Sequence, residues 1–448
     1  MEYPEYDNYK ETNIDWLGNI PKHWEIIKLS WLFKMIGSGT TPDTNNLDYY
    51  NGDIPWVNTS ELRDDFINDT KKQITRKALN DISGLRLYPK NTLLIALYGA
   101  TIGQLGILKI KATVNQACCA LTEAKDNVHI KFIFYWLLAN RNNILSYSYG
   151  GGQPNISQDT VRNLKITLPK FREQKVIVKY LDKETTRIDN LIKKKEKLID
   201  FLEEKRQAVI TQAVTKGLNP DASMKDSGLE WLGEIPEHWE AIKLKFLLKK
   251  KKNAIKTGPF GSQIKSSEMI NSEIKVYNQN NVLENDINKG NNYISKEKYK
   301  ELKSFEVYPG DILITTRGTI GEAVLLPQNI EKGILHPCLM RIQPDNNKLN
   351  SKYLEIIINE SKFFRTQLFL ASNGTTIDVI YSENLKNVKV ILPPLEEQNR
   401  LFNYIKEYNN EIDTLICKVE KQISNLKEYR QALITNAVTG KIDVRDLV

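Results

Sequence analysis

The chain repeats itself, and this duplication constrains its fold more than any other feature of the sequence. Segment 15–34 reads DWLGNIPKHWEIIKLSWLFK and segment 230–249 reads EWLGEIPEHWEAIKLKFLLK, so thirteen of the twenty positions are identical. Further on, LPKFREQ at 168–174 returns as LPPLEEQ at 392–398. Because these motifs occur twice in the same order, we predict two copies of one structural unit.

The two ends of the chain complement each other. After Thr215 the sequence runs through MKDSGLEWLG into the second copy, whereas after Thr439 it stops within nine residues. The missing continuation matches the N-terminal stretch YKETNIDWLG. We therefore expect the termini to lie near each other and the two copies to be related by a pseudo-twofold axis.

The segment that ends each copy is predicted to be one long helix. Apolar residues recur there in alternating steps of four and three, which is typical of a coiled-coil seam. Gly217 and Gly440 follow the two segments and make suitable helix stops. A twofold relation would make the two helices pack antiparallel. The expected seam positions are Ile177, Leu181, Glu184, Ile188, Leu191, Lys195, Leu198, Leu202, Lys205, Val209 and Gln212, and then Leu401, Ile405, Tyr408, Ile412, Leu415, Val419, Gln422, Leu426, Tyr429, Leu433 and Asn436.

Between the repeated motifs, strand-like runs alternate with helix-like runs. The apolar stretch 92–108 contains Gln104 and three glycines, so it is interpreted as two buried strands around a turn. The predicted fold class is α+β, with two mixed α/β domains related by a pseudo-twofold and separated by two long antiparallel helices that form a coiled coil. Further strand-like runs are 164–168, 312–316 and 388–392, and helix-like runs are 130–140 and 352–364. The expected boundaries are 1–168 for the first domain, 169–216 for the first helix, 217–229 for a linker, 230–391 for the second domain, 392–440 for the second helix and 441–448 for a tail.

Composition and charge are those of a globular protein. Charged residues make up 26% of the chain and hydrophobic residues 41%. The net charge of +8 permits a polyanionic partner without requiring one. Four cysteines with no CxxC pair argue against a disulfide scaffold and against a zinc site. The polar, acidic start MEYPEYDNYKE predicts no secretory signal, so we expect a cytoplasmic protein.

No enzyme motif is found in the sequence. The phosphate-loop pattern GxxxxGK[ST] is absent, which argues against an ATPase. An Asn-Pro-Pro-aromatic tetrapeptide and a glycine-rich methyl-donor loop are also absent, which argues against a DNA methyltransferase. His23 and His238 occupy the same repeat position within PxHWE and are interpreted as structural. We therefore predict no catalytic residue and no metal ligand.

The duplicated motifs resemble those of one protein family. The WLGxIPxHWE motif, the GxTIG turn, LPPLEEQ and RQALITxAVTG are similar to motifs of the specificity subunit of type I restriction-modification systems. The resemblance implies that the variable domains are target recognition domains, each of which reads one half of a bipartite, asymmetric sequence in double-stranded DNA. It further implies that the long helices serve as a ruler and a docking surface.

The resemblance also implies which subunits bind this chain and which of them carry out the reactions. Two methyltransferase subunits would bind this chain and methylate adenine N6, and up to two restriction subunits would join where the DNA is also cleaved. S-adenosylmethionine, ATP and magnesium would be bound by those partners, and this chain would bind no cofactor. The competing interpretation is a duplicated coiled-coil adaptor without DNA sequence preference, which would show no steep salt dependence of duplex binding.

Residues that read DNA are expected where the two copies diverge, at 38–86 and 256–306. Amides pair with adenine and cations with guanine in the major groove, although for each single residue a solvated surface position competes. Asn58 and Asn278 fall at equivalent places, and Arg317 stands where the first copy has Tyr98. Glycine-bounded loops and the shared turn add further candidates. The full set is Asn58, Thr59, Ser60, Arg63, Lys71, Lys72, Arg76, Thr101, Gln153 and Asn155 in the first copy and Gln263, Lys265, Asn278, Gln279, Asn280, Asn281, Arg317, Thr319, Asn373 and Thr375 in the second.

The repeated helix ends provide candidates for partner binding. Arg206 and Gln207 are matched by Arg430 and Gln431. Packing between the two helices would explain the match, and so would a partner site that occurs twice. The family resemblance favours the partner site.

Overall fold

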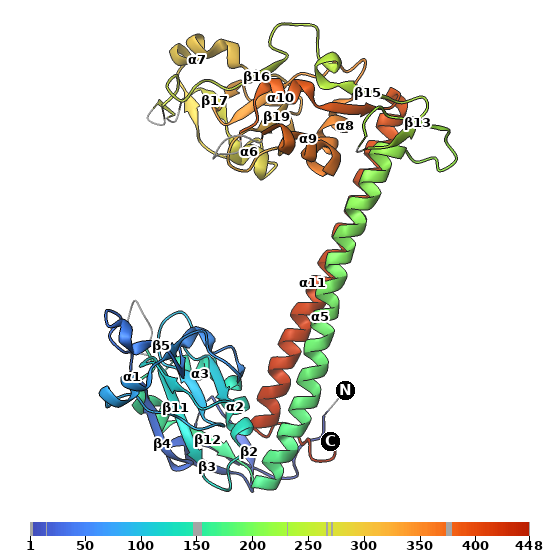
Figure 1. Cartoon of the computed structure of the whole chain (residues 1–448). Coiled ribbons are helices and arrows are strands. Elements are labelled where there is room, and N and C mark those ends of the chain that lie inside the picture. Colours follow the sequence, from blue (N-terminus) through green and yellow to red (C-terminus); the bar gives the residue numbers. More distant parts are fainter. Residues whose placement is uncertain are drawn as a thin grey trace. The chain divides into compact units, whose positions relative to one another are not determined.

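The computed structural model describes residues 3–14, 16–146, 155–230, 232–265, 268–269, 272–372 and 379–447. It divides into two compact units, of which the first comprises Met1–Glu196 with Glu420–Val448 and the second Lys197–Val419. Each unit contains an α/β part and a stretch of both long helices, α5 (Phe171–Lys216) and α11 (Leu395–Val438) (Figure 1). Among the described residues, no helix is long and apolar enough to cross a membrane.

The first unit is built around a five-stranded sheet with strand order β4-β11-β8-β9-β6, and a three-stranded sheet has the order β10-β5-β7. Two further pairs, β12-β3 and β1-β2, complete the unit. The strands are β1 (Tyr9–Glu11), β2 (Asn19–Pro21), β3 (Glu25–Lys28), β4 (Phe33–Ser38), β5 (Tyr50–Val57), β6 (Asp65–Ile67), β7 (Gln73–Ile74), β8 (Leu93–Ala96), β9 (Leu105–Leu108), β10 (Thr113–Val114), β11 (Cys118–Ala124) and β12 (Lys165–Leu168). The short helices are α1 (Arg76–Asp81), α2 (Ile130–Ala139), α3 (Arg141–Ser146) and α4 (Gln158–Asn163).

The second unit repeats this topology except for β6, which has no counterpart among its described strands. Its sheets have the orders β16-β22-β19-β20 and β18-β17-β21, with the pairs β15-β23 and β13-β14. The strands are β13 (Met224–Asp226), β14 (Glu234–Pro236), β15 (Glu240–Lys243), β16 (Ile255–Thr257), β17 (Ile274–Tyr277), β18 (Tyr293–Ile294), β19 (Ile312–Thr315), β20 (Ala323–Leu325), β21 (Gly333–Leu335), β22 (Leu339–Ile342) and β23 (Lys389–Leu392). The helices are α6 (Gln279–Leu283), α7 (Lys296–Leu302), α8 (Ser351–Glu360), α9 (Lys362–Ser372) and α10 (Ser382–Asn387).

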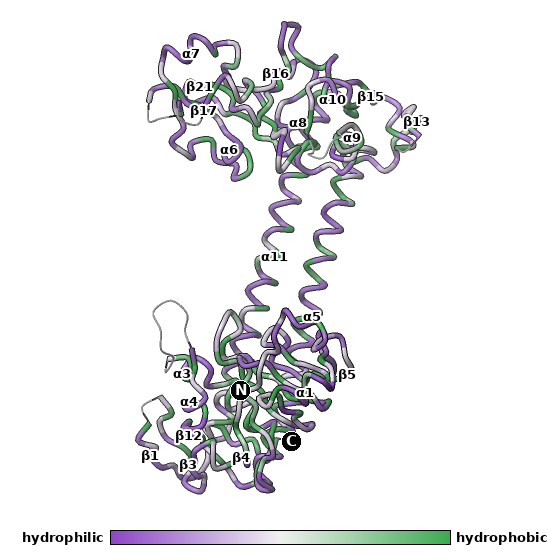
Figure 2. Tube along the Cα trace, turned by 60° about the vertical axis from the view of Figure 1, so that its left-hand side comes forward, coloured by the Kyte–Doolittle hydropathy of each residue, from purple (hydrophilic) through white to green (hydrophobic). Residues whose placement is uncertain are grey.

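The strand predictions are confirmed. Within 92–108, β8 and β9 are both fully buried and pair antiparallel, as expected for two core strands around a turn. Figure 2 shows hydrophobic residues gathered in the interior of each α/β part. The prediction of one helix over 352–364 is wrong, because Ser361 adopts an extended conformation and separates α8 from α9.

The two long helices pack antiparallel in both units, as predicted (Figure 1). In the first unit Arg430 donates two hydrogen bonds to Asp189, of 2.8 and 3.2 Å. In the second unit Arg206 forms the equivalent ion pair with Asp413. Both partners are shifted by 224 positions between the copies, so one antiparallel register occurs twice.

The predicted coiled-coil seam is correct at alternate positions along both helices, since Ile412, Val419 and Leu433 are buried and Lys195 and Leu202 are half-buried. Ile177, Leu181 and Ile188 are buried, but Leu198 is 43% exposed and Leu415 44% exposed. The positions in between are displaced by one residue, so that Ile192 is buried and Ile199 is half-buried where Leu198 is exposed. A straight α-helix has 3.6 residues per turn and drifts away from a strict heptad, so a four-residue step restores the contact. The equivalent step in α11 brings Ile416, Ile423 and Arg430 inward in place of Leu415, Gln422 and Tyr429.

The expected closure of the chain on itself is confirmed. The amide of Asp443 donates a 2.7 Å hydrogen bond to the carbonyl of Pro4, which joins the two terminal segments in the first unit (Figure 1). Gly440 has φ +74° and lies so close to Pro21 that an added Cβ would come within 2.2 Å of it. Gly217 has φ +78° and lies equivalently against Trp239. Each long helix thus ends on the WLGxIPxHWE motif of the other copy, at a glycine that permits the left-handed conformation.

Candidate nucleic-acid and partner interface

A carboxylate at the start of each long helix holds the repeated motif. Glu173 accepts hydrogen bonds from Trp24 (3.0 Å) and His23 (2.9 Å) in the first unit. Glu397 accepts the same bonds from Trp239 (2.7 Å) and His238 (2.8 Å) in the second. The prediction that His23 and His238 are structural is therefore confirmed.

The neighbouring glutamines clamp the same helix ends. Gln174 accepts a hydrogen bond from the amide of His129 (2.8 Å) and donates to the carbonyls of Asn127 (3.0 Å) and Pro169 (2.9 Å). Gln398 makes the three equivalent bonds in the second unit, and both glutamines are fully buried. The EQ pair of each motif thus fixes the α/β part to its long helix.

The two equivalent asparagines are helix caps. Asn58 precedes a 3₁₀-helix (Thr59–Glu61) in a capping box, and its amide donates a 2.8 Å hydrogen bond to Glu61. Asn278 caps α6 in the same way, with Asn281 in the place of Glu61. The two asparagines thus have the same structural role at equivalent places in the two copies.

The prediction that Asn281 contacts DNA is wrong. Its side chain is fully buried and donates to the carbonyls of Asp286 (3.0 Å) and Lys289 (2.7 Å). Its oxygen accepts from the amide of Asn278, so the carboxamide has partners on both sides. A buried and satisfied amide cannot reach a base edge.

The structure brings several divergent candidates to the shared hairpin turn. In the second unit, Gln279 at the start of α6 donates a 3.4 Å hydrogen bond to the carbonyl of Thr319, in the turn between β19 and β20. Arg317 is exposed on the same turn and forms a bridge with Val379. Asn155 is exposed and bridges Tyr98 at the equivalent place in the first unit. In each unit a segment from elsewhere in the chain therefore joins this hairpin turn, and in the second unit the Gln279 side chain reaches it as well.

A paired carboxylate beside this turn was missed by the sequence analysis. Asp64 accepts a 3.0 Å hydrogen bond from the amide of Leu105 and forms an ion pair with Arg141. Arg141 also donates a 2.9 Å hydrogen bond to the carbonyl of Gly103. No local sequence pattern reveals an ion-pair partner 77 positions away. These contacts fix Arg63, an exposed candidate, next to the turn.

The other candidates lie apart from this cluster or outside the described residues. Lys71 and Lys72 line a cavity of about 590 Å³ together with Tyr50 and Trp56. Arg76 forms a 3.3 Å ion pair with Asp53. The remaining described candidates are Thr59 and Thr101, which are half-buried, and Ser60, Gln263, Lys265 and Asn280, which are exposed. Gln153, Asn373 and Thr375 lie outside the described residues.

The two arginines for which a partner site is predicted contact the neighbouring long helix. The shifted seam turns Arg206 and Arg430 toward the neighbouring helix, where they pair with Asp413 and Asp189. Only 14% of the Arg206 side chain and 29% of the Arg430 side chain are exposed. Packing between the helices therefore explains why these arginines occur in both copies. The matched glutamines differ: Gln207 is half-buried, and Gln431 is exposed.

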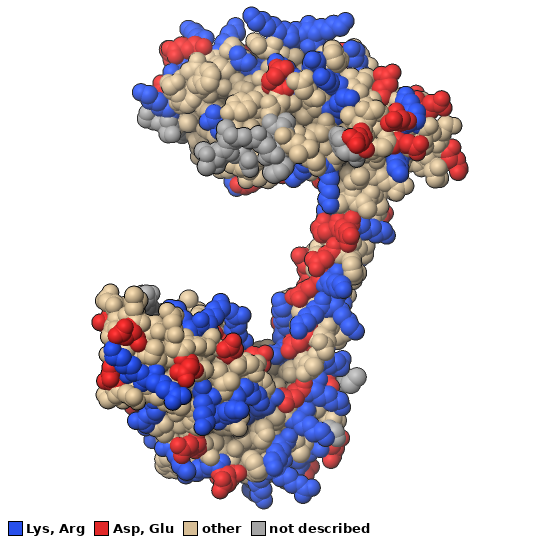
Figure 3. Space-filling view, in the orientation of Figure 1, with Lys and Arg blue, Asp and Glu red and all other residues tan. Residues whose placement is uncertain are grey.

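Positive charge is spread over the surface with local concentrations. Figure 3 shows Lys and Arg gathered on the visible face of the first unit, with Asp and Glu interspersed. Such a surface attracts a polyanion without specifying its sequence. Sequence preference would have to come from the divergent side chains at the turns.

Comparisons with known proteins agree with this repeated arrangement. The family model of the type I restriction modification DNA specificity domain matches residues 21–200 and 236–425. The MjaVIII specificity subunit of Methanocaldococcus jannaschii is 27% identical over 457 residues, which cover 100% of this chain and 99% of that protein. The EcoKI specificity subunit of Escherichia coli K12 is 22% identical, with 95% and 90% covered.

Solved structures show the same fold. A chain from a study of assembly and conformational transition of the type I R-M system superposes with a TM-score of 0.70 at 16% identity, and 94% of this chain and 98% of that chain are covered. The HsdS subunit from Thermoanaerobacter tengcongensis gives a TM-score of 0.56 at 16% identity, with the same shares covered. The chain therefore belongs to the family of type I restriction-modification specificity subunits, and it carries the family's DNA specificity domain twice.

Proposed function

We propose that this chain is the DNA-reading subunit of a type I restriction-modification complex, in which each unit reads one half of a bipartite, asymmetric target. The observation that carries the proposal is the hairpin that occurs in both copies, whose turn is flanked by divergent polar residues: Asn155 in the first copy, and Gln279 and Arg317 in the second. The match to two DNA specificity domains supports it, and an adaptor without sequence preference has no such support.

In this proposal the chain itself catalyses no step. Its role is to place an adenine of each half-site before a methyltransferase subunit, and to direct cleavage where a restriction subunit is present. S-adenosylmethionine, ATP and magnesium are then bound by the partner subunits. The sequence supports this division, since it contains no phosphate loop and no methyl-donor loop.

We expect Arg317→Ala to weaken binding to the specific target by about 1–3 kcal/mol and to relax one base position, because Arg donates two hydrogen bonds to guanine. Duplex binding by the assembled methyltransferase, measured over a library of single-base variants, checks this result. If Arg317 instead contacts a phosphate, affinity falls evenly over the library, and the slope of log affinity against log salt concentration decreases in magnitude by about one. Arg172→Ala, at an exposed position at the start of α5, is the control. Unchanged affinity and slope would exclude Arg317 from the interface.

We further propose that two methyltransferase subunits bind, one to each unit. An exposed aromatic side chain stands at the same repeat position in both copies, namely Trp31 in the 3₁₀-helix Leu29–Trp31 and Phe246 in the 3₁₀-helix Leu244–Leu247. Each is 61% exposed. Large aromatic side chains are the residues that most often dominate interface energies. An exposed aromatic side chain at the same position in both copies fits a partner that binds once to each unit.

Trp31→Ala and Phe246→Ala are each expected to weaken one of the two methyltransferase sites by about 2 kcal/mol, because an aromatic anchor is lost from the interface. Native mass spectrometry at limiting methyltransferase should then show mainly one subunit bound in place of two. Phe201→Ala is the matched control, since Phe201 is 54% exposed and the other copy has an asparagine there. Full occupancy of both sites in the two variants would contradict this assignment.

A further inference from the structure

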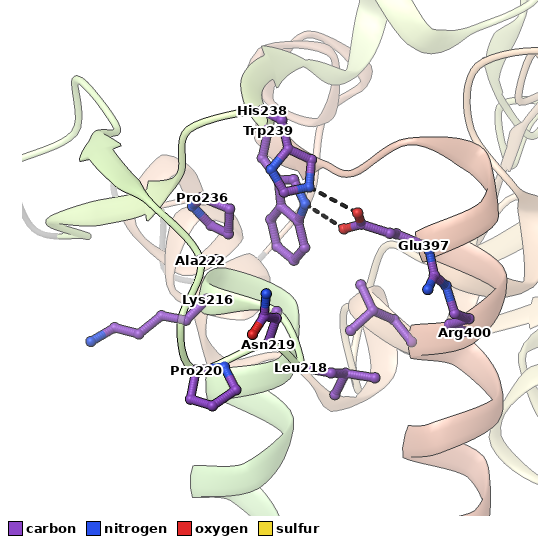
Figure 4. A pocket seen from close by; sticks show the side chains of 12 residues that line it. Lys216, Leu218, Asn219, Pro220, Ala222, Pro236, His238, Trp239, Glu397 and Arg400 are labelled. Carbon is purple, nitrogen blue, oxygen red and sulfur yellow. Dashed lines mark hydrogen bonds and ion pairs between the residues drawn. The ribbon is translucent and has the colours of Figure 1, made fainter.

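A cavity of about 440 Å³ lies in the second unit, where the linker after α5 crosses the start of α11 (Figure 4). Its size falls within the range of small-ligand pockets. The carboxylate of Glu397 is held at one side by His238 and Trp239, and Arg400 follows on the same helix (Figure 4). The linker residues Leu218, Asn219, Pro220 and Ala222 form the opposite wall.

The equivalent place in the first unit is occupied by a side chain of the chain itself. The Tyr6 hydroxyl donates a 2.9 Å hydrogen bond to Glu173, the counterpart of Glu397. The Tyr6 ring lies edge-on to Trp24 at 5.9 Å between centroids, and the guanidinium of Arg445 lies 5.0 Å from the ring centroid. Burial and the charge of Glu173 raise the pKa of Tyr6, so the phenol remains a proton donor.

The second copy keeps the carboxylate with its histidine and tryptophan donors, but it lacks the tyrosine. At the repeat offset of 215 that relates the two WLG motifs, the position of Tyr6 is taken by Asp221. Glu397 consequently has two donors where Glu173 has three. Its side chain is 29% exposed, against 9% for Glu173. A carboxylate offers about four acceptor sites, so Glu397 retains capacity for another donor.

We propose that this cavity receives a tyrosine side chain from another protein chain. The phenol donates to Glu397, and the ring packs on the wall formed by Trp239 and Leu401, as Tyr6 does against Trp24. Arg400 takes the part that Arg445 plays in the first unit, a cation beside the ring. Arg400 is specific to the second copy, since the first has Val176 at the equivalent position of its helix. The site therefore distinguishes the two halves of an otherwise repeated scaffold, and it does not depend on the proposed reading of DNA.

The test uses the full chain and a synthetic peptide with the sequence around Tyr6, acetyl-PEYDN-amide, with acetyl-PEFDN-amide as the matched probe. Isothermal titration is expected to give one saturable site for the tyrosine peptide and binding about tenfold or more weaker for the phenylalanine peptide, because a hydrogen bond to a charged acceptor is lost. Asp221→Tyr, which supplies an occupant within the chain, is expected to abolish binding of both peptides.

Arg400→Ala keeps the carboxylate and its two donors in place, and it is expected to weaken the tyrosine peptide several-fold. Circular dichroism confirms that each variant is folded before titration. Equal binding of the two peptides, unchanged binding to Asp221→Tyr, or no saturable binding to the unmodified chain would each overturn the proposal.

Discussion

Exchange of segment 256–306 for the equivalent segment of a related specificity subunit is expected to change one half of the DNA target and to leave the other half unchanged. The segment contains β16, β17, α6, β18 and α7, and it lies wholly in the second unit. It includes the exposed candidates Gln263, Lys265 and Asn280, and the buried Asn281 that holds loop 286–289, so it must be moved as a whole. The first unit has its own sheets and caps, and the exchange alters none of them.

Mapping of methylated adenines in a host that expresses the chimaera with its methyltransferase gives the readout. The reciprocal exchange of 38–86 is the control, and it should alter the other half-site only. A chimaera that changes both half-sites would contradict the assignment of one reader to each unit. A chimaera that methylates the original sequence at full level would place recognition outside these segments.

Gln174→Ala is expected to lower the free energy of unfolding of the first unit by about 3 kcal/mol. The change removes three hydrogen bonds and leaves one amide and two carbonyls without this partner, each at a cost of about 1–3 kcal/mol if it stays dry. Urea unfolding monitored by tryptophan fluorescence measures the shift, because Trp24 is buried in the first unit and Trp239 in the second.

Two further variants make this result specific. Gln398→Ala should destabilise the second unit to a similar extent, because Gln398 makes the equivalent three bonds. Arg172→Ala, two positions before Gln174 and exposed, should change stability by no more than about 0.5 kcal/mol. An unfolding curve of Gln174→Ala that superposes on that of the unmodified protein would show that the clamp contributes nothing to stability.

The duplication made the architecture predictable, because each motif could be compared with its own copy. The two long helices, the antiparallel packing and the meeting of the chain ends all follow from that comparison. The contacts of individual side chains were harder to predict from the sequence. The heptad count misplaces every second position after Ile188 by one residue, since it treats the helix as if it had 3.5 residues per turn. That one-residue shift also decides the environment of Arg206, for which the family resemblance favoured a partner site over helix packing.

The candidate recognition residues were harder to judge, because composition does not distinguish an asparagine that caps a helix from one that contacts a base. Asn278 and Asn281 occupy one short stretch with Gln279, yet two of the three serve the local backbone. Burial and hydrogen-bond partners separate them, and both depend on chain segments that the local sequence does not reveal. The pairing of Asp64 with Arg141 is of the same kind.

Where Pro4 meets Asp443, the two terminal segments are held together by a hydrogen bond and not by a peptide bond. A hydrogen bond joins the chain there, whereas the linker after Gly217 joins the equivalent place covalently. The molecule can therefore be regarded as a ring opened at one of two matching joints. A circular permutant opened in the linker and fused through the present termini is expected to keep the sheets of both units, with the order of the two copies in the gene reversed.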